Sequence, residues 1–428
     1  MVQLPTQNFD PTAFRLALDA GLKRFATGFT KIVALSLPQI DPQMAQYQIG
    51  GPTFSTLEKA VTREYGIRPE DLSDGSVAPD ADILAVVAPR QLDQKSIFAI
   101  DQFLMRGGTV ILATSPFTAE LSGGKLRLRD WDSNLQQWLA HNGLDIRKTL
   151  VLDKQNARLP APIARQSGDY EFRDVQMIDY PYFIDLRPPG LAADHPVTGN
   201  LPQVTMAWAS PIVVEPDPAR RVSVLLESSP DSWLRKSMNI MPSLDADGHS
   251  NLVAPTPDRN SANAAPVTAR RTLGVAVQGR FNSFFTDTAS PWDPSDIHSA
   301  PTKPGLTAPD ASVIARSPES ARIVLYSSND FMDDQILNSI VAGSGTQYLG
   351  PLQLFMNTLD WGLQDEQLLD IRSRGHFNRS LSPMERQTQL LIEYFNYGLA
   401  LLWLLLLALV NWLQSLLHRR HYRQGLLL

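Results

Sequence analysis

Short apolar runs alternate with amphipathic segments over the first third of the chain. The runs at 31–37, 81–89, 109–117 and 148–153 predict buried strands. Segments 53–66, 92–108 and 134–143 carry apolar residues at helical spacing and end at a glycine, which predicts helices. Strands that alternate with helices in this way are typical of a doubly wound, mostly parallel sheet, as in flavodoxin-like α/β folds. We therefore expect residues 30–153 to form one layer of such a sheet.

The chain begins with a separate amphipathic pattern. Asp10 followed by Pro11 is a typical helix start, and large apolar residues then recur every three or four positions: Phe14, Leu18, Leu22, Phe25 and Phe29. This pattern predicts an amphipathic helix or linker over residues 1–29.

Beyond about residue 160 the pattern changes to strands and turns. Strands are expected within 203–216, 221–229 and 273–281, and a late strand of the main sheet within 321–331, followed by a helix from about Met332. Helical spacing returns at 352–363. Two stretches poor in core residues, 241–270 and the proline-rich 288–319, predict flexible segments. Residues 30–370 would then form one α/β domain with strand-rich insertions.

The last long apolar stretch has the length and composition of a membrane-spanning helix. Gly398 to Val410 contains no polar side chain, and apolar residues dominate from Leu390 to Leu417. At roughly 1.5 Å per residue, such a helix crosses a hydrocarbon layer of about 30 Å. We predict a transmembrane helix at 391–417, a basic tail at 418–428, and membrane-interface positions at both ends: Tyr394, Tyr397, Trp412, Arg419, Arg420 and Arg423.

The segment before this helix predicts where the helix begins. Ser382, Pro383 and Glu385 form a capping box, so residues 371–390 would be a juxtamembrane linker and helix start. Three arginines lie within twenty residues upstream and three downstream, so the count of positive charges leaves the orientation open. The downstream charges are closer and denser, which weakly favours a cytoplasmic tail.

Composition and charge exclude several classes of protein. A hydrophobic fraction of 43% is enough for real cores, and the net charge of -6 argues against nucleic acid as a partner. The sequence has no cysteine, which excludes disulfides and thiolate chemistry. The amino terminus carries no secretory signal pattern, so a body exported from the cytoplasm would need a membrane segment upstream, in a longer or split gene.

The usual signatures of nucleotide or hydrolytic chemistry are missing. The Gly-Gly-Lys at 123–125 lacks the first glycine and the final Ser or Thr of a Walker loop, and no Gly-x-Ser-x-Gly occurs. His141 and His195 are candidate bases, but each also reads as an ordinary helix-end or turn residue. No histidine pair in the body has metal-ligand spacing. We therefore expect no catalytic residue, no metal and no cofactor.

One candidate ligand site follows from the predicted sheet. Ligands of open parallel sheets collect at the carboxyl ends of the strands, where this chain places Ser115, Ser328, Asn329 and Asp330. Together with Asp333 and Asp334, these groups could hold a cation or a solute amine. The alternative is that Asp330 caps the following helix and that Asp333 and Asp334 stabilise its first turn.

Several segments, taken together and in order, resemble one family. They include 81–117, "DHPVTGNL" at 194–201, "LLESSPDSW" at 225–233, "LGVAVQGRF", "RIVLYSSNDFMDDQ", "FMNTLDWGLQDEQLLDIRSRG" and "LSPMERQ" before the terminal helix. The chain thereby resembles the GldG-like accessory family of ABC-type transport systems, associated with gliding motility, whose soluble domain is similar to intraflagellar-transport and glutamine-amidotransferase-like folds.

The resemblance implies a non-catalytic accessory subunit in the bacterial inner membrane. Its body would lie in the periplasm and its carboxyl terminus in the cytoplasm, beside an ABC-2-type permease served by a separate ABC ATPase. Membrane lipid and an envelope protein or solute ligand would be further partners. Two alternatives stay open: a membrane-anchored envelope hydrolase or transferase, and a cytoplasmic tail-anchored adaptor.

Overall fold

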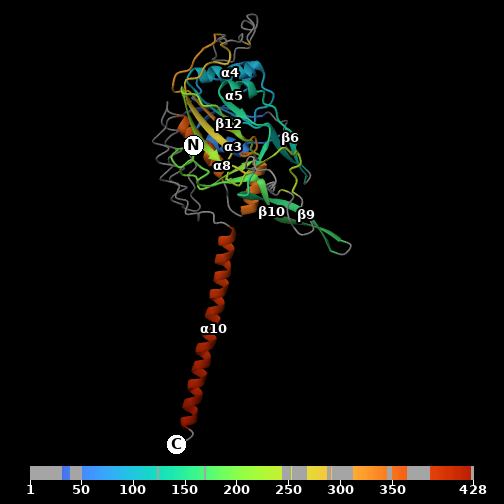
Figure 1. Ribbon diagram of the computed structural model, residues 1–428, viewed down its shortest axis with the longest axis vertical. Coiled ribbons are helices and arrows are strands. Elements are labelled where there is room, and N and C mark those ends of the chain that lie inside the picture. The colour runs from blue at the N-terminus through green and yellow to red at the C-terminus, as the bar shows by residue number, and fades with distance from the viewer. Residues whose placement is uncertain are drawn as a thin grey trace, which may run out of the picture. The chain divides into compact units, whose positions relative to one another are not determined.

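The computed structural model describes most of the 428-residue chain. Described are residues 31–38, 51–122, 125–167, 170–242, 268–286, 312–344, 349–363 and 386–425, with single residues at 252 and 291. The chain divides into two compact units, residues 1–376 and residues 377–428, which are taken separately below (Figure 1). The predicted helix over 1–29, the capping box at 382–385 and most of the predicted flexible segments 241–270 and 288–319 lie outside the described residues.

A seven-stranded sheet forms the centre of the first unit. Its strands, in spatial order, are β13 (Arg220–Glu227), β15 (Thr272–Gly279), β16 (Arg322–Tyr326), β4 (Thr109–Ala113), β3 (Ile83–Val87), β1 (Ile32–Ser36) and β2 (Gly66–Pro69). The five strands from β16 to β2 run parallel, whereas β13, β15 and β16 pair antiparallel. The sheet is therefore mixed, and the predicted parallel character holds for its larger part.

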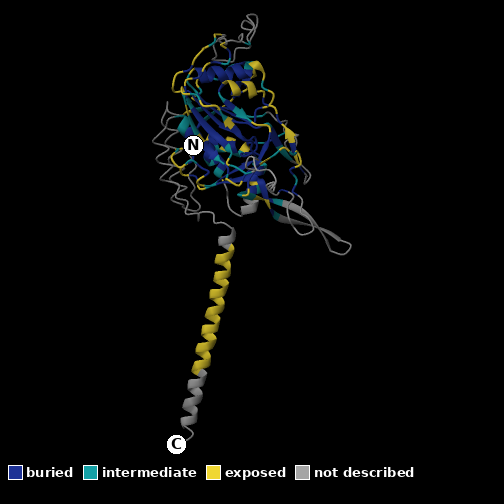
Figure 2. Cartoon of the chain, viewed as in Figure 1, coloured by how far each residue is buried: buried dark blue, intermediate teal, exposed yellow. Residues whose placement is uncertain are grey.

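Helices pack on both faces of this sheet. Alternate strand residues such as Ile83 and Ala85 share one core with α3 (Ser55–Glu64) and α8 (Gly350–Gly362). Their neighbours Leu84 and Val86 share a second core with α4 (Gln94–Met105) and α5 (Gln136–His141). Strands buried on both faces need the continuous apolar runs that the sequence shows (Figure 2).

Smaller sheets surround the main one. A three-stranded sheet joins β9 (Asn156–Ser167), β10 (Tyr170–Leu186) and β11 (Val204–Ala207). Three two-stranded pairs are β5 (Phe117–Ser122) with β6 (Lys125–Asp130), β7 (Leu144–Ile146) with β12 (Ile212–Val214), and β8 (Leu150–Leu152) with β14 (Trp233–Arg235). The remaining short elements are the 3₁₀ helix η1 (Leu72–Asp74) and helix α7 (Asp334–Ser344).

Two details of the predicted layer at 30–153 are wrong. The run at 148–153 forms β8, which pairs with β14 instead of joining the main sheet. Gly66 was expected to end a helix, but α3 ends at Glu64 and Gly66 opens β2, which pairs with β1. In both places pairing with another strand, and not the local sequence pattern alone, decides where the segment lies.

The second unit contains one long helix, α10 (Arg386–Gly425). Its residues 390–414 have a mean hydropathy of 1.8 and are long and apolar enough to cross a membrane. All of them are exposed in the structure (Figure 2). Arg419, Arg420 and Arg423 lie in the last turns of the same helix.

Candidate functional site

The structure brings Ser115, Ser328, Asn329 and Asp330, here called the rim cluster, to one place. Ser115 follows β4 and the other three follow β16, and these two strands are parallel neighbours with Ala113 opposite Tyr326. Parallel strands end at the same edge of a sheet, so residues more than 200 positions apart meet there. All four residues are at most 2% exposed.

Asn329 joins the two strand ends. Its Nδ2 donates to the backbone oxygens of Ser115, at 2.8 Å, and Phe117, at 2.7 Å. Its Oδ1 accepts from the backbone N–H of Ser115 at 3.2 Å. The amide therefore satisfies three buried backbone groups, two in the loop after β4 and one at the start of β5.

The two serines of the rim cluster make similar internal contacts. Ser115 Oγ lies 3.2 Å from Ser210 Oγ and accepts from the Phe117 N–H. Ser328 Oγ donates to the Ala207 carbonyl at 2.5 Å and accepts from the N–H groups of Asp330 and Phe331, both at 3.1 Å. These bonds connect the ends of β4 and β16 to the end of β11 and to the loop after it.

Asp330 is a buried carboxyl group facing β5. Thr118 Oγ1 donates to its Oδ1 at 2.5 Å, and the Ala119 N–H donates to its Oδ2 at 3.3 Å. Burial raises the pKa of Asp330 well above its usual value and neighbouring Asp333 adds to this, whereas the bonds from Thr118 and Ala119 oppose it. The proposed alternative role of Asp330 as a cap is therefore wrong, because the side chain binds β5 and not the helix.

We expect Asp330→Asn to flatten the dependence of stability on pH. A carboxyl group whose folded pKa is raised contributes stability that is fully present below its unfolded pKa of 3.8 and is lost as pH rises through the folded value. An amide has no such titration and can accept from Ala119 while donating to Thr118. The measurement is the unfolding free energy of both proteins from pH 4.5 to 8.

The prediction concerns how the difference in unfolding free energy between the two proteins changes with pH. Relative to wild type, the Asp330→Asn protein should gain stability steadily as pH increases. A constant difference between the two proteins across this range would show that Asp330 keeps the same protonation in the folded and unfolded chain.

Asp333 and Asp334 connect α7 to the start of α3. Asp333 Oδ1 accepts from the Thr53 N–H at 2.6 Å, and burial raises the pKa of Asp333 to about 7. Asp334 Oδ2 and Oδ1 accept from the N–H groups of Ser55 and Thr56, both at 2.8 Å. Burial acts to raise the pKa of Asp334, but the bonds from Thr56 and Ser55 outweigh it and leave the pKa lowered. Asp334 thus caps a helix that begins 279 residues earlier.

Loss of this cap has a measurable cost. Phe54, at the N-cap position of α3, makes no side-chain cap bond, so Asp334 satisfies the first N–H groups of the helix. Asp334→Ala should lower the unfolding free energy by about 1 kcal/mol, in the range of other lost caps. Thermal unfolding measures this, with the exposed Asp194→Ala as control. Equal melting temperatures for both variants would contradict the assignment of the cap.

The candidate bases lie away from the rim cluster. His195 Nδ1 accepts from the Val197 N–H at 3.3 Å, and its ring lies 5.0 Å from that of Trp361. Burial, with a contribution from Arg322, lowers the pKa of His195 to about 4. Arg322, which acts on His195, is the first residue of β16, whereas Ser328 lies beyond the last residue of this strand. Arg322 and Ser328 are therefore separated by about 13 Å or more along the strand.

His141 is exposed and its Nε2 lies 3.0 Å from the Asn282 carbonyl. The structure therefore does not assemble either histidine with Ser115.

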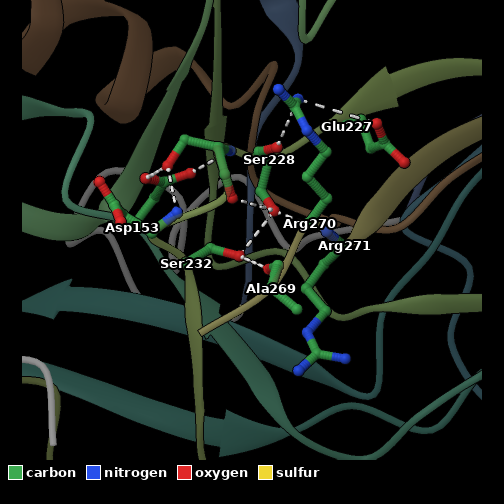
Figure 3. A network of polar contacts seen from close by, with 9 residues as sticks. Asp153, Glu227, Ser228, Ser232, Ala269, Arg270 and Arg271 are labelled. Atoms are coloured by element: carbon green, nitrogen blue, oxygen red, sulfur yellow. Dashed lines mark hydrogen bonds and ion pairs between the residues drawn. The ribbon is translucent and has the colours of Figure 1, made fainter. Parts of the chain in front are cut away.

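A second buried polar network was not predicted from the sequence. Ser228 Oγ contacts Ser232 Oγ at 2.7 Å and accepts from the Arg271 N–H at 2.8 Å, and Ser232 Oγ donates to the Ala269 carbonyl at 2.5 Å (Figure 3). At its edge Arg270 Nη1 lies 3.8 Å from Glu227. The sequence predicts a strand within 221–229 that leads into a turn, and β13 confirms the strand, but no local pattern indicates the hydrogen bonds of the serines to the segment before β15.

Asp153 extends the same network to β8. Its Oδ2 accepts from the Ser229 N–H at 2.7 Å and its Oδ1 from Ser229 Oγ at 2.5 Å (Figure 3). The residue is fully buried. The network therefore connects the end of β8, the turn after β13 and the segment that leads into β15.

The described residues contain no group of three His, Asp or Glu side chains suited to a metal ion. In α10, Tyr394, Tyr397 and Trp412 are exposed, and Tyr397 Oη donates to Glu393 Oε1 at 2.9 Å. Tyr394 and Tyr397 lie near one end of the apolar span and Trp412 near the other, as membrane-interface aromatics would.

Comparison with known proteins gives one family. Residues 36–361 match the model of a family described as an ABC-type uncharacterized transport system. No curated protein matches the chain. A solved structure titled "mmIFT52 N-terminal domain" is similar over 78% of this chain and 97% of that one, with 9% identity and a TM-score of 0.37, which is too low to carry an argument.

Proposed function

Because the chain belongs to the ABC-type uncharacterized transport system family, we propose that it is a non-catalytic, membrane-anchored accessory subunit of a GldG-like ABC-2-type transport system. The family match over residues 36–361 is the observation that carries this proposal. The apolar helix α10, which begins after the matched region, supports anchoring in a membrane. A permease subunit and a separate ABC ATPase would be the partners, since the chain has no phosphate-binding loop of its own.

Isolation of the full-length protein from its own membranes tests this function. Solubilisation in a mild detergent followed by affinity isolation should recover an ABC permease and an ABC ATPase, identified by mass spectrometry. A variant with aspartates at 402 and 406 should recover neither, because its anchor no longer inserts. Recovery of the intact protein without transporter subunits, under conditions that preserve other ABC complexes, would reject the proposal.

The orientation is part of the same proposal. We place the body in the periplasm and the carboxyl terminus in the cytoplasm of the inner membrane. The family resemblance supports this arrangement, as does the dense basic cluster at Arg419, Arg420 and Arg423. A cytoplasmic tail-anchored adaptor is the competing arrangement.

The hydrogen bonds of the rim cluster support a structural role for these four residues. Its hydroxyl, amide and carboxyl groups already bind backbone and side-chain partners within the first unit. Binding of a solute by Ser115, Ser328, Asn329 and Asp330 stays a prediction, as does the amidotransferase-like classification of the fold.

An envelope hydrolase or transferase is the alternative that substitution can test. Ser115→Ala and His195→Ala should each restore the phenotype of a strain that lacks the protein, because an accessory subunit needs neither as nucleophile or base. Immunoblotting controls for the amount of protein. Loss of function at normal abundance in either variant would favour the enzyme.

A further inference from the structure

The polar residues of α10 gather on one face of the helix. At 3.6 residues per turn, Glu393, Asn396, Asn411 and Gln414 fall within about 60° of the circumference. The opposite face carries only apolar residues over the same length, among them Leu391, Leu402, Leu409 and Leu413. A helix that met only lipid would have no reason to collect its polar side chains in this way.

This face also follows a seven-residue repeat. One series consists of Glu393, Ala400, Leu407 and Gln414, and a second, four residues further along, of Tyr397, Leu404 and Asn411. Spacings of three and four in alternation are the pattern of a left-handed helix pair. Most helix pairs in membranes cross with the same geometry. The two series, here called the seam, thus form a continuous contact surface.

Asn411 gives the seam a polar centre of contact inside the bilayer. The region between Glu393 and Arg419 is centred near residue 406, so Asn411 lies about 8 Å from the middle of a hydrocarbon layer about 30 Å thick. Residues 390–414 are all exposed in the structure. An amide in hydrocarbon is costly unless it is hydrogen-bonded, so Asn411 requires a polar group on a neighbouring helix.

We propose that the seam binds the seam of a second copy of this chain, with the two α10 helices parallel in the membrane. An asparagine or glutamine carries both donor and acceptor, so Asn411 and Gln414 are complementary to their own copies across a two-fold axis. Between Tyr397 and Gln414 the seam carries no charge that would repel an identical surface. A single asparagine in such a repeat also fixes register and favours a pair of helices over larger bundles.

The absence of cysteine from the whole sequence makes a direct test possible. In full-length protein in its native membranes, Leu404→Cys and Leu407→Cys place a single thiol on the seam. Leu402→Cys and Leu409→Cys place it on the opposite face. Mild oxidation should yield disulfide-linked dimers from the first two variants and little from the second two, as seen on non-reducing gels.

Asn411→Leu in the Leu407→Cys protein tests the polar contact. Association should weaken about three- to twentyfold, the range expected from one hydrogen bond between membrane helices. Leu409→Ile in the same background is the matched control and should leave the dimer yield unchanged. An unchanged yield after Asn411→Leu would overturn the role of the amide.

Equal dimer yields from both faces would overturn the proposal. So would cross-links from the seam to a different membrane protein in place of a second copy, since the seam would then belong to that partner. The proposal depends on α10 crossing the membrane but not on the transporter, so recovery of ABC subunits from detergent is an independent result.

Discussion

Replacing both Leu402 and Leu406 by aspartate is expected to abolish membrane integration. The two side chains are 56% and 43% exposed, and both lie near the middle of the apolar span. Each charge at the centre of a membrane helix costs about 3 kcal/mol, and together they exceed what the remaining leucines compensate. The measurement is the share of protein that stays in the membrane pellet after alkaline carbonate washing.

A conservative pair controls for changes in packing. Leu402→Ile with Leu406→Ile keeps the apolar character and should pellet like wild type. If the aspartate variant also pelleted fully, another part of the chain would hold the protein to the membrane.

Asn329→Ala is expected to cause a large loss of stability in the first unit. The substitution removes one acceptor and two donors, and leaves the Ser115 N–H and the carbonyls of Ser115 and Phe117 buried without this partner. Each such group costs about 1–3 kcal/mol, so the unfolding free energy should fall by at least about 3 kcal/mol. Denaturant unfolding of the detergent-solubilised protein, followed by tryptophan fluorescence, measures this loss.

The exposed Asn200→Ala provides the comparison for this variant. It should change the unfolding free energy by less than about 0.5 kcal/mol, as is usual for surface positions. Similar losses in both variants would mean that the hydrogen bonds of Asn329 do not hold the strand ends together.

The strands of the main sheet could be predicted because strands that are buried on both faces show a continuous apolar run in their own sequence. Ile83–Val87 and Thr109–Ala113 are covered on both faces, which favours an almost continuous run of apolar residues, interrupted in these two strands only by Thr109. The short run at Leu150–Leu152 has the same composition, yet it pairs with Trp233–Arg235 outside the sheet. A buried strand does not encode its partner in its own residues.

The hairpin of β9 and β10 shows the opposite difficulty. Its strands contain Pro160, Pro162 and Pro181, residues that argue against strand structure in sequence-based reasoning. Antiparallel pairing of Asn156–Ser167 with Tyr170–Ile184 nevertheless forms the longest ladder described in the structure. Pairing between the two strands therefore overrides the signal of the single residues.

For the candidate site, the sequence predicted which residues lie close together but not which elements bury them. Ser115 and Asn329 lie together at the carboxyl ends of two parallel strands, the edge at which the sequence analysis placed them. Their burial depends on β5 and on the loop after β11, whose positions cannot be derived from the rim residues. The capping of α3 by Asp334 was missed for the same reason, since no local pattern connects residues 279 positions apart.

The buried polar side chains of the first unit hold its elements together. Buried side chains such as Asn329, Asp330 and Asp153 bind strand ends and turns to one another. The family match and the apolar helix concern association with a transporter and with a membrane. The function we propose rests on these two features together.

The most direct test of the central claim is the accessibility of single cysteines on the two sides of the membrane. Lys236→Cys places a thiol on the exposed surface of the first unit, and Gln424→Cys places one near the end of α10. In spheroplasts with an intact inner membrane, a membrane-impermeant maleimide should label the Lys236→Cys protein at once and the Gln424→Cys protein only after permeabilisation. Labelling of the Gln424→Cys protein alone, or of both proteins equally before permeabilisation, would contradict a periplasmic body anchored by one membrane-spanning helix.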